Sequence, residues 1–301
     1  MTMMQAPSEG ETLLSGLPPP DRKSLLPIIQ QLGGDEEARK GFVKSELQFF
    51  HAQKEKSPLS QLHPDWVLEA LLMENPRMVA TILRYLPGEM ARYVIDHFPE
   101  ERLQALPSLS ESFALEPSLA QVLKHLFEEQ FQIPQTRSLH EGISFEMIPH
   151  LSRIELEKFF RKVGVCEMAK ALSTLHEKAV SIILNRLPPS DTKDIQAFMT
   201  QLGQFTPARL RQAQTHLLAI EVEKGPPEYL LIETGFYVYS KAVLPIDEPG
   251  VLLIRRKFPK NLGFLLKRYV TKHLETNTEK MASRYREEIV NLLKEFVVGK
   301  I

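Results

Sequence analysis

The residue types that most often do chemistry are few and scattered in this sequence. Its nine His residues form no His-x-x-x-His pair and Cys166 is the single cysteine, so the ligand spacing of a zinc site is missing. No Gly-x-Gly-x-x-Gly and no Gly-x-x-x-x-Gly-Lys-Ser/Thr pattern occurs, so the sequence offers no loop to cradle phosphates. Gly33-Gly34 follows an apolar segment and is typical of a helix C-cap. The sequence therefore predicts no enzyme, no cofactor and no metal site.

Three single residues have structural interpretations. Cys166 lies beside a predicted helix start, and we interpret it as a structural thiol. His97 is expected at a helix end, beside the negative pole of the helix dipole. Trp66 is expected to anchor the first helix of the folded part of the chain.

One end of the chain is strongly basic. Residues 251–301 hold twelve basic and five acidic side chains, which makes this end +7, whereas the other 250 residues carry about −8. A solvated helix face is the favoured interpretation, followed by a contact with another protein or a membrane surface. Aromatic residues interleave with the cations, as in a nucleic-acid groove, but the apolar residues there also trace an ordinary amphipathic helix. The seven cations that define this basic tail are Arg255, Arg256, Lys257, Lys260, Lys267, Arg268 and Lys272.

The composition is that of a globular chain without a membrane span. The 301 residues are 43% hydrophobic and 25% charged, and no run reaches the eighteen or so apolar residues that a spanning helix needs. The N-terminus lacks the order of a secretion signal, and a single cysteine fits a reducing compartment. We therefore expect a cytoplasmic protein.

The predicted fold is mainly α. Short amphipathic helices separated by Pro, Gly and Ser fill the region from Asp65 to Glu223. Candidate strands are confined to residues 229–233, 236–245 and 251–258, so a small α+β region is possible at the C-terminal end. Residues 1–20 read as a leader, with helices at about 21–32 and 35–54 and a linker at 54–64. The expected domains are 1–60, 62–135, 140–225 and a basic C-terminal extension, 226–301.

An internal repeat is the most informative feature. When the chain is shifted by 89 residues, apolar positions at helical spacing coincide over four helices, with two prolines in register. This predicts two armadillo or HEAT-like units of about 65 residues, packed as a superhelical rod. The coinciding positions include Ala80 with Ala169, Leu83 with Leu172, Leu86 with Leu175, Val94 with Ile183, Ile95 with Leu184, and Phe98-Pro99 with Leu187-Pro188.

The stretch "ENPRMVATILRYLP" (74–87) has two interpretations. Pro76 suits the first turn of a helix and Asn75 is a good N-cap, so the stretch can be a simple helix start. Alternatively, the corner formed by Glu74, Asn75, Pro76 and Arg77 is a surface that also binds a partner.

This stretch resembles the middle domain of the flagellar motor switch protein FliG family, in which a Glu-His-Pro-Gln-Arg motif precedes an apolar helix. Here Asn75 replaces the His and Arg77 replaces the Gln. Residues 151–220 are similar to the family's C-terminal domain, with Ala171-Leu172-Ser173-Thr174 in place of Ala-Leu-Lys-Gly and Thr206-Pro207-Ala208-Arg209 in place of Gly-Pro-Val-Arg. The resemblance covers roughly residues 62–225.

The resemblance implies a charged ridge on the second unit, which in the family faces the stator and generates torque. Its basic positions fall on Lys193 and Arg209, but its acidic pair falls on Thr200 and Gln201. A steered electrostatic contact needs both signs. We therefore expect no torque, and we expect charge reversal at Lys193 or Arg209 to leave assembly unchanged.

The expected function is that of a non-enzymatic scaffold linking a membrane ring to a cytoplasmic ring of a flagellar or flagellum-related type III secretion apparatus. The implied partners are other ring proteins and further copies of this chain, with peripheral contact at the cytoplasmic face of the bacterial inner membrane. Two alternatives remain: a regulatory helical domain like the cytoplasmic part of magnesium channels, or a nucleic-acid-binding protein that uses the basic tail.

Overall fold

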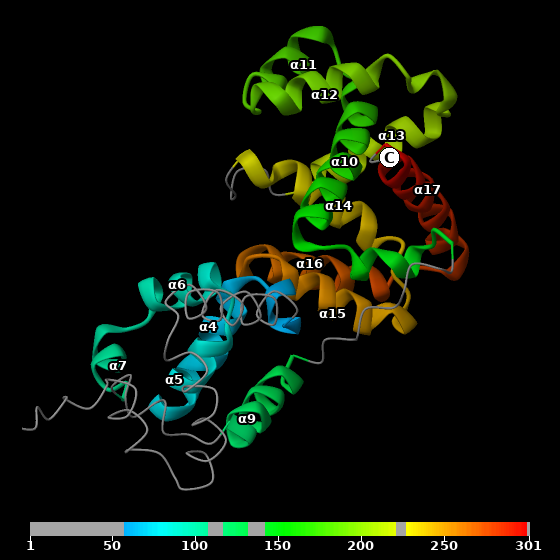
Figure 1. Cartoon of the computed structure of the whole chain (residues 1–301). Helices are drawn as coiled ribbons and strands as arrows, with labels where there is room; N and C mark the ends of the chain where they lie inside the picture. Colours follow the sequence, from blue (N-terminus) through cyan, green and yellow to red (C-terminus); the bar gives the residue numbers. More distant parts are fainter. Residues whose placement is uncertain (1–56, 108–116, 132–141, 221–226, 300–301) are drawn as a thin grey trace, which may run out of the picture. The chain divides into compact units, whose positions relative to one another are not determined.

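The computed structural model describes residues 57–107, 117–131, 142–220 and 227–299, and within these ranges the chain is helical without a strand (Figure 1). These residues belong to one compact unit that begins at Ser57. The predicted mainly-α class is confirmed for them. The expected leader, the helices at 21–32 and 35–54, and the Gly33-Gly34 cap lie outside the described residues.

The first group of helices has its own apolar core. The linker expected at 54–64 is wrong for its described part, because Leu59 and Leu62 are fully buried in this core. Trp66 is buried beside them, as the sequence indicated. The elements of the first group are η1 (Pro58–Gln61), α4 (Pro64–Met73), α5 (Pro76–Tyr85), α6 (Gly88–His97), α7 (Glu100–Gln104) and α9 (Pro117–Glu129).

The second group builds a larger core around two of its helices, α10 and α14. Its first part consists of η2 (Phe145–His150), α10 (Arg153–Leu172), α11 (Glu177–Leu184), α12 (Pro189–Met199), η3 (Leu202–Gln204) and α13 (Pro207–Leu218). Its second part consists of η4 (Pro227–Tyr229), α14 (Leu230–Ser240), η5 (Pro245–Asp247), α15 (Glu248–Lys257), α16 (Lys260–Leu274) and α17 (Glu279–Val298).

The strand candidates at the C-terminal end are wrong. Residues 230–240 form α14, whose eleven residues are all buried, and residues 251–257 lie in α15. A helix buried on every side has no polar face, so its sequence shows neither helical nor strand periodicity. The second core also draws residues from both sides of position 226, from Phe145 to Leu293. The described part of the expected C-terminal extension, residues 227–299, therefore contributes to this core and is not a separate tail.

The helix starts recur with the spacing found in the sequence. Helices α4, α6 and α7 begin at residues 64, 88 and 100, and α10, α11 and α12 begin 89 residues later, at 153, 177 and 189. Helix α9 begins at 117 and α13 at 207, after one inserted residue. The environments match in part. Phe98 and Leu187 are both 7% exposed, whereas Ile95 is 45% exposed and its counterpart Leu184 is 6% exposed.

The two groups differ most at Pro76. The first group has a break between α4 and α5, where Asn75 is extended (φ −74°, ψ 157°), while the second group has the continuous helix α10. Pro76 cannot donate an amide hydrogen bond and forces the preceding residue out of the helical region, so it breaks the helix. The position 89 residues later is Val165, which lets α10 continue.

Helices α10 and α14 cross at backbone contact, with two glycines at the crossing. A Cβ atom on Gly164 would lie 1.8 Å from the carbonyl oxygen of Leu231, and one on Gly235 would lie 2.2 Å from that of Phe160. Only glycine fits at such an approach. Figure 1 shows α14 beside α10, which is the helix that α12, α13 and α17 also contact.

Candidate functional site

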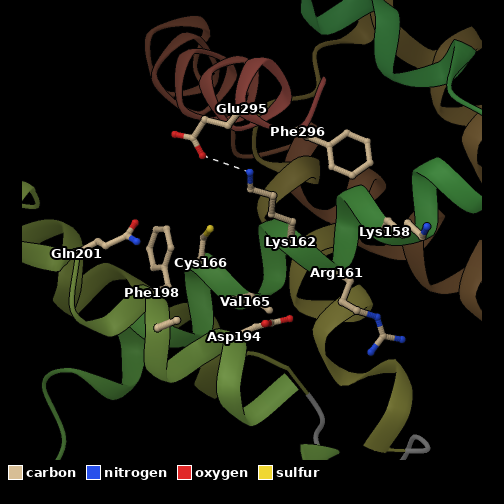
Figure 2. Close-up of a pocket in the computed structure, with 11 residues that line it drawn as sticks. Lys158, Arg161, Lys162, Val165, Cys166, Asp194, Phe198, Gln201, Glu295 and Phe296 are labelled. Atoms are coloured by element: carbon tan, nitrogen blue, oxygen red, sulfur yellow. Dashed lines mark ion pairs between the residues drawn. The ribbon is translucent and has the colours of Figure 1, made fainter. Parts of the chain in front are cut away.

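A groove bordered by α10, α12 and α17 combines apolar and charged side chains (Figure 2). Its volume is about 520 Å³. A neighbouring pocket of about 580 Å³ shares Phe198, Gln201 and Glu295 and extends to Lys170 and Glu288. The residues lining the groove are Lys158, Arg161, Lys162, Val165, Cys166, Asp194, Ala197, Phe198, Gln201, Glu295 and Phe296.

Ion pairs fix the walls of the groove. Arg161 of α10 donates to both carboxylate oxygens of Asp191 of α12, at 2.9 and 3.1 Å, and Asp191 is buried. Lys162 of α10 pairs with Glu295 of α17 at 3.3 Å, the dashed line in Figure 2. The aromatic rings of Phe198 and Phe296 line the groove together with these charged side chains, and such a lining suits an apolar side chain of a bound polypeptide.

Cys166 lines this groove but is not a candidate nucleophile. Its side chain is 1% exposed, and burial raises the pKa of its thiol to about 12. The thiolate that would attack a substrate is therefore scarce at neutral pH. This agrees with its interpretation as a structural cysteine.

Beneath the groove lies a buried ionic network, named here the Glu167 cluster, which consists of Glu167, Lys170, Arg209, His216 and Glu288. Arg209 of α13 donates two hydrogen bonds to the carboxylate of Glu167 in α10, and also donates to Glu288 of α17 at 3.1 Å through Nε. Lys170 pairs with both carboxylates. The cluster joins three helices that are far apart in the sequence.

The electrostatics of the cluster favour charged Glu167 and Arg209. Burial opposes ionisation of Glu167, but the hydrogen bonds and charges of His216, Arg209 and Lys170 outweigh it, so its pKa lies far below the ordinary value. The pKa of Arg209 is raised by the paired carboxylates despite burial. Each carboxylate is thus compensated by at least one cation.

His216 completes the cluster as a neutral ring. Burial lowers its pKa, although Glu167 acts in the opposite direction. With a neutral ring, Nδ1 donates to Glu167 at 2.6 Å and Nε2 accepts from the hydroxyl of Tyr285 at 3.1 Å. This fixes one tautomer and ties α13 to α17.

The predicted corner at the start of α5 is a helix cap in the structure. The side chain of Asn75 accepts a hydrogen bond from the amide of Met78 at 2.9 Å, so the predicted cap is confirmed. Arg102 donates to the main-chain carbonyl of Glu74 at 2.9 Å, and Gln130 donates to its carboxylate at 3.2 Å. Arg77 is exposed. The cap does not test the second interpretation, so partner binding at this corner stays a proposal.

The predicted charged ridge is not formed as a pair. Lys193 is exposed on α12, but Arg209 is only 3% exposed and is held in the Glu167 cluster. The assignment of Arg209 to an exposed ridge is therefore wrong, because its guanidinium compensates the buried carboxylate of Glu167 and the partly buried carboxylate of Glu288. Charge reversal at Arg209 would place a third carboxylate among them, so we expect it to destabilise the fold, and its effect on assembly stays a prediction.

The predicted basic tail is mostly a packing element. Arg255 lies between the rings of Trp66 and Phe264, 4.8 and 4.7 Å from their centroids. Lys257 is fully buried and donates to the carbonyls of Pro149 and Leu151 at 2.9 and 2.7 Å.

The next cations of this run bind the first group of helices. Arg256 donates to the carbonyl of Phe131, and Lys260 pairs with Glu69 at 2.9 Å. Only Lys267, Arg268 and Lys272 are exposed. The favoured interpretation as a solvated face holds for these three and is wrong for Lys257.

The sequence did not point to Glu167, the centre of the cluster. Its signal was an acidic and a basic residue, Glu167 and Lys170, three positions apart in the otherwise apolar second half of α10, 163–172. Charged residues on an apolar face are buried only when paired, so this spacing could have been recognised.

Two features are absent from the residues that the structure describes. No group of three or more His, Cys, Asp or Glu there is placed to hold a metal ion. No described helix is both long and apolar enough to cross a bilayer. Comparisons of the chain with models of protein families, with curated proteins and with solved structures found no match.

Proposed function

We propose that this chain is a non-enzymatic scaffold of the FliG-like type, which links a membrane ring to a cytoplasmic ring of a flagellar or flagellum-related type III secretion apparatus. The observation that carries the proposal is the recurrence of helix starts at 64, 88 and 100 as 153, 177 and 189. Tandem helical units of one kind, armadillo or HEAT-like, present long ridges and grooves to other proteins.

Two surfaces are available for ring partners in this proposal. The first is the corner at Glu74–Arg77, where the exposed Arg77 and the 85% exposed side chain of Met73 lie at the break between α4 and α5. A charged and an apolar side chain at one exposed corner are typical of a binding surface. The second is the groove in Figure 2, whose walls are fixed before any partner arrives.

We infer a static joint and not a torque-generating one. Burial of Arg209 leaves Lys193 as the exposed member of the ridge, and Thr200 and Gln201 supply no opposing charge. A single cation cannot set the alternating pattern that a steered contact needs.

The proposed location is the cytoplasmic face of the bacterial inner membrane, at the base of the apparatus. Lys267, Arg268 and Lys272 are exposed on α16 and suit a peripheral contact with anionic lipid. Nucleic-acid binding is not favoured, because Arg255, Arg256 and Lys257 are engaged in packing.

The test is co-purification of the chain with ring proteins expressed from the same host. Arg77→Ala is expected to abolish capture of one ring protein without changing the melting temperature. Arg92→Ala is the matched control, since Arg92 is exposed on α6 and pairs only with Asp96 of its own helix among the described residues. Capture of every ring protein at wild-type levels by Arg77→Ala would rule out the corner as a binding surface.

A further inference from the structure

A second concave surface, unrelated to the groove of Figure 2, lies against α13, α14 and α17. Its volume is about 490 Å³, within the range of small-molecule sites. Three of the side chains lining it are cations, Arg211, Lys241 and Arg284, and none of its lining side chains among the described residues is a carboxylate. We name it the cationic pocket.

Lys241 is the central cation of this pocket. It is half-buried, with its ammonium 5.3 Å from the ring centroid of Tyr237 and 5.9 Å from that of Tyr285. Its ammonium group makes no hydrogen bond and no ion pair with the described residues. A partly desolvated cation without a counter-ion is unfavourable, and a bound anion would remove this cost.

The surroundings of Lys241 add further positive charge. Burial lowers the pKa of Lys241, Glu167 acts in the opposite direction, and Lys272 and Arg209 lower it further. The carboxylate of Glu167 is already bound by Arg209 and His216. Ala208, in the first turn of the twelve-residue helix α13, also lines the pocket, at the positive end of the helix dipole. The sequence of α13 contains no Asp or Glu.

Neutral donors complete the pocket. Gln212 and Thr215 line it beside His216, whose ring is fixed by Glu167 and Tyr285 and closes the pocket toward the Glu167 cluster. An amide and a hydroxyl beside several cations are typical of sites for phosphate oxygens.

We propose that the cationic pocket binds a small anion that carries phosphate groups, with Lys241, Arg211 and Arg284 as its ligands. The proposal is independent of the scaffold function, because the pocket shares no lining residue with the groove of Figure 2 or with the corner at Glu74–Arg77. A free phosphorylated metabolite and a lipid headgroup share this chemistry, and the experiment separates them.

The experiment measures binding of inorganic pyrophosphate to the full chain by calorimetry at physiological salt. Lys241→Gln is expected to weaken binding by about tenfold or more, and Arg211→Gln is expected to weaken it too. Lys178→Gln removes the same charge from an exposed position on α11, outside both the pocket and the proposed lipid contact, and is expected to bind like the wild type. Lys241→Arg, which keeps the charge, is expected to restore most of the affinity.

The melting temperature is the control for correct folding. Lys241→Gln should leave it unchanged or raise it, because the substitution removes a desolvated cation. Vesicles containing phosphatidylglycerol form the second arm: binding that is lost in Lys241→Gln and displaced by pyrophosphate assigns the phosphate to a lipid headgroup. Saturable pyrophosphate binding without vesicle binding assigns it to a free metabolite. Absence of saturable binding to the wild type, or equal loss in Lys241→Gln and Lys178→Gln, would overturn the proposal.

Discussion

Replacing Glu167 by Gln tests whether the Glu167 cluster holds the second group of helices together. Glu167 is 2% exposed and accepts hydrogen bonds from Arg209 and from Nδ1 of His216. The substitution keeps the shape but leaves two buried cations, Arg209 and Lys170, facing only the carboxylate of Glu288. Breaking a buried ion pair from one side costs about 3–5 kcal/mol, and the remaining amide oxygen favours the lower end of this range.

The loss is measurable by urea unfolding followed by far-UV circular dichroism. About 3 kcal/mol corresponds to a fall in melting temperature of about 6–12 °C for a domain of this size. Glu295→Gln is the matched control. It removes the carboxylate of an ion pair with Lys162 in which the Glu295 side chain is 64% exposed, and an exposed pair of this kind contributes at most about 1 kcal/mol to stability.

Two results would refute this reasoning. The first is a fall of less than about 1 kcal/mol in the free energy of unfolding for Glu167→Gln, which would mean that the cluster contributes no more than a solvent-exposed ion pair. The second concerns the double variant Glu167→Leu, Arg209→Leu, which leaves Lys170 paired with Glu288. It should lose less than the sum of its single variants, since neither charge is left alone. Additive losses would show that the pair is not coupled.

The same cluster predicts how the free energy of unfolding changes with pH. The pKa of Glu167 is held far below its ordinary 4.5, so the folded chain keeps its carboxylate charged where the unfolded chain would protonate it. Its stabilisation is therefore present above about pH 4.5 and is lost as the pH falls below that value. Glu167→Gln should show a weaker loss of stability in acid than the wild type.

Three further predictions concern packing, burial and capping. Gly164→Ala should cost about 1–3 kcal/mol or more in urea unfolding, because its Cβ would meet a main-chain carbonyl of α14, whereas Gly88→Ala, with no atom within 4 Å, should change stability by less than about 1 kcal/mol. Burial lowers the pKa of Lys257 from 10.5 to about 8, so the folded state releases this proton at a lower pH than the unfolded state does, and the free energy of unfolding should rise between pH 8 and 10.5. This rise should be absent from Lys257→Met. If it persists in that variant, Lys257 is not the group responsible. Asn75→Ala should lose about 1 kcal/mol of stability as a missing cap, and Arg77→Ala less than about 0.5 kcal/mol, so equal melting temperatures for both would contradict the role of Asn75.

Local signals in the sequence predicted the helices that have a polar face. Pro76 after Asn75 marked the start of α5, and the side chain of Asn75 makes the expected hydrogen bond. Pro189 and Pro207 likewise stand in the first turns of α12 and α13. These signals are local because a cap and its partner amide lie within three residues of each other.

The sequence prediction failed where burial on all sides of a helix removed its hydrophobic periodicity. The run "YLLIETGFYVYS" has the aromatic and β-branched residues of a strand, but it forms α14, whose residues are buried all around. Gly235 in its middle also weakens a helix prediction, yet it is required there by the contact with Phe160. The contact lies 75 positions away in the sequence and has no local trace.

The candidate sites could be predicted only as single residues. Arg209 was recognised as a charged position, but its partners Glu167 and Glu288 lie 42 and 79 positions away. Without these partners a cation is expected to be exposed. The burial of Lys257 could not be predicted for the same reason, since its hydrogen-bond acceptors are main-chain carbonyls more than 100 positions earlier in the chain.

The central position of α10 has a consequence for synthesis on the ribosome. This helix is complete at Leu172, but α14 and α17, which cover it, end only at Ser240 and Val298. At about 5–20 residues per second, the ribosome needs roughly 6–25 s to supply them. During this interval Phe159 and Phe160 lack their partners in the later helices. We therefore expect a fragment that stops near residue 225 to aggregate or require a chaperone, whereas the same residues fold once α17 has left the ribosome.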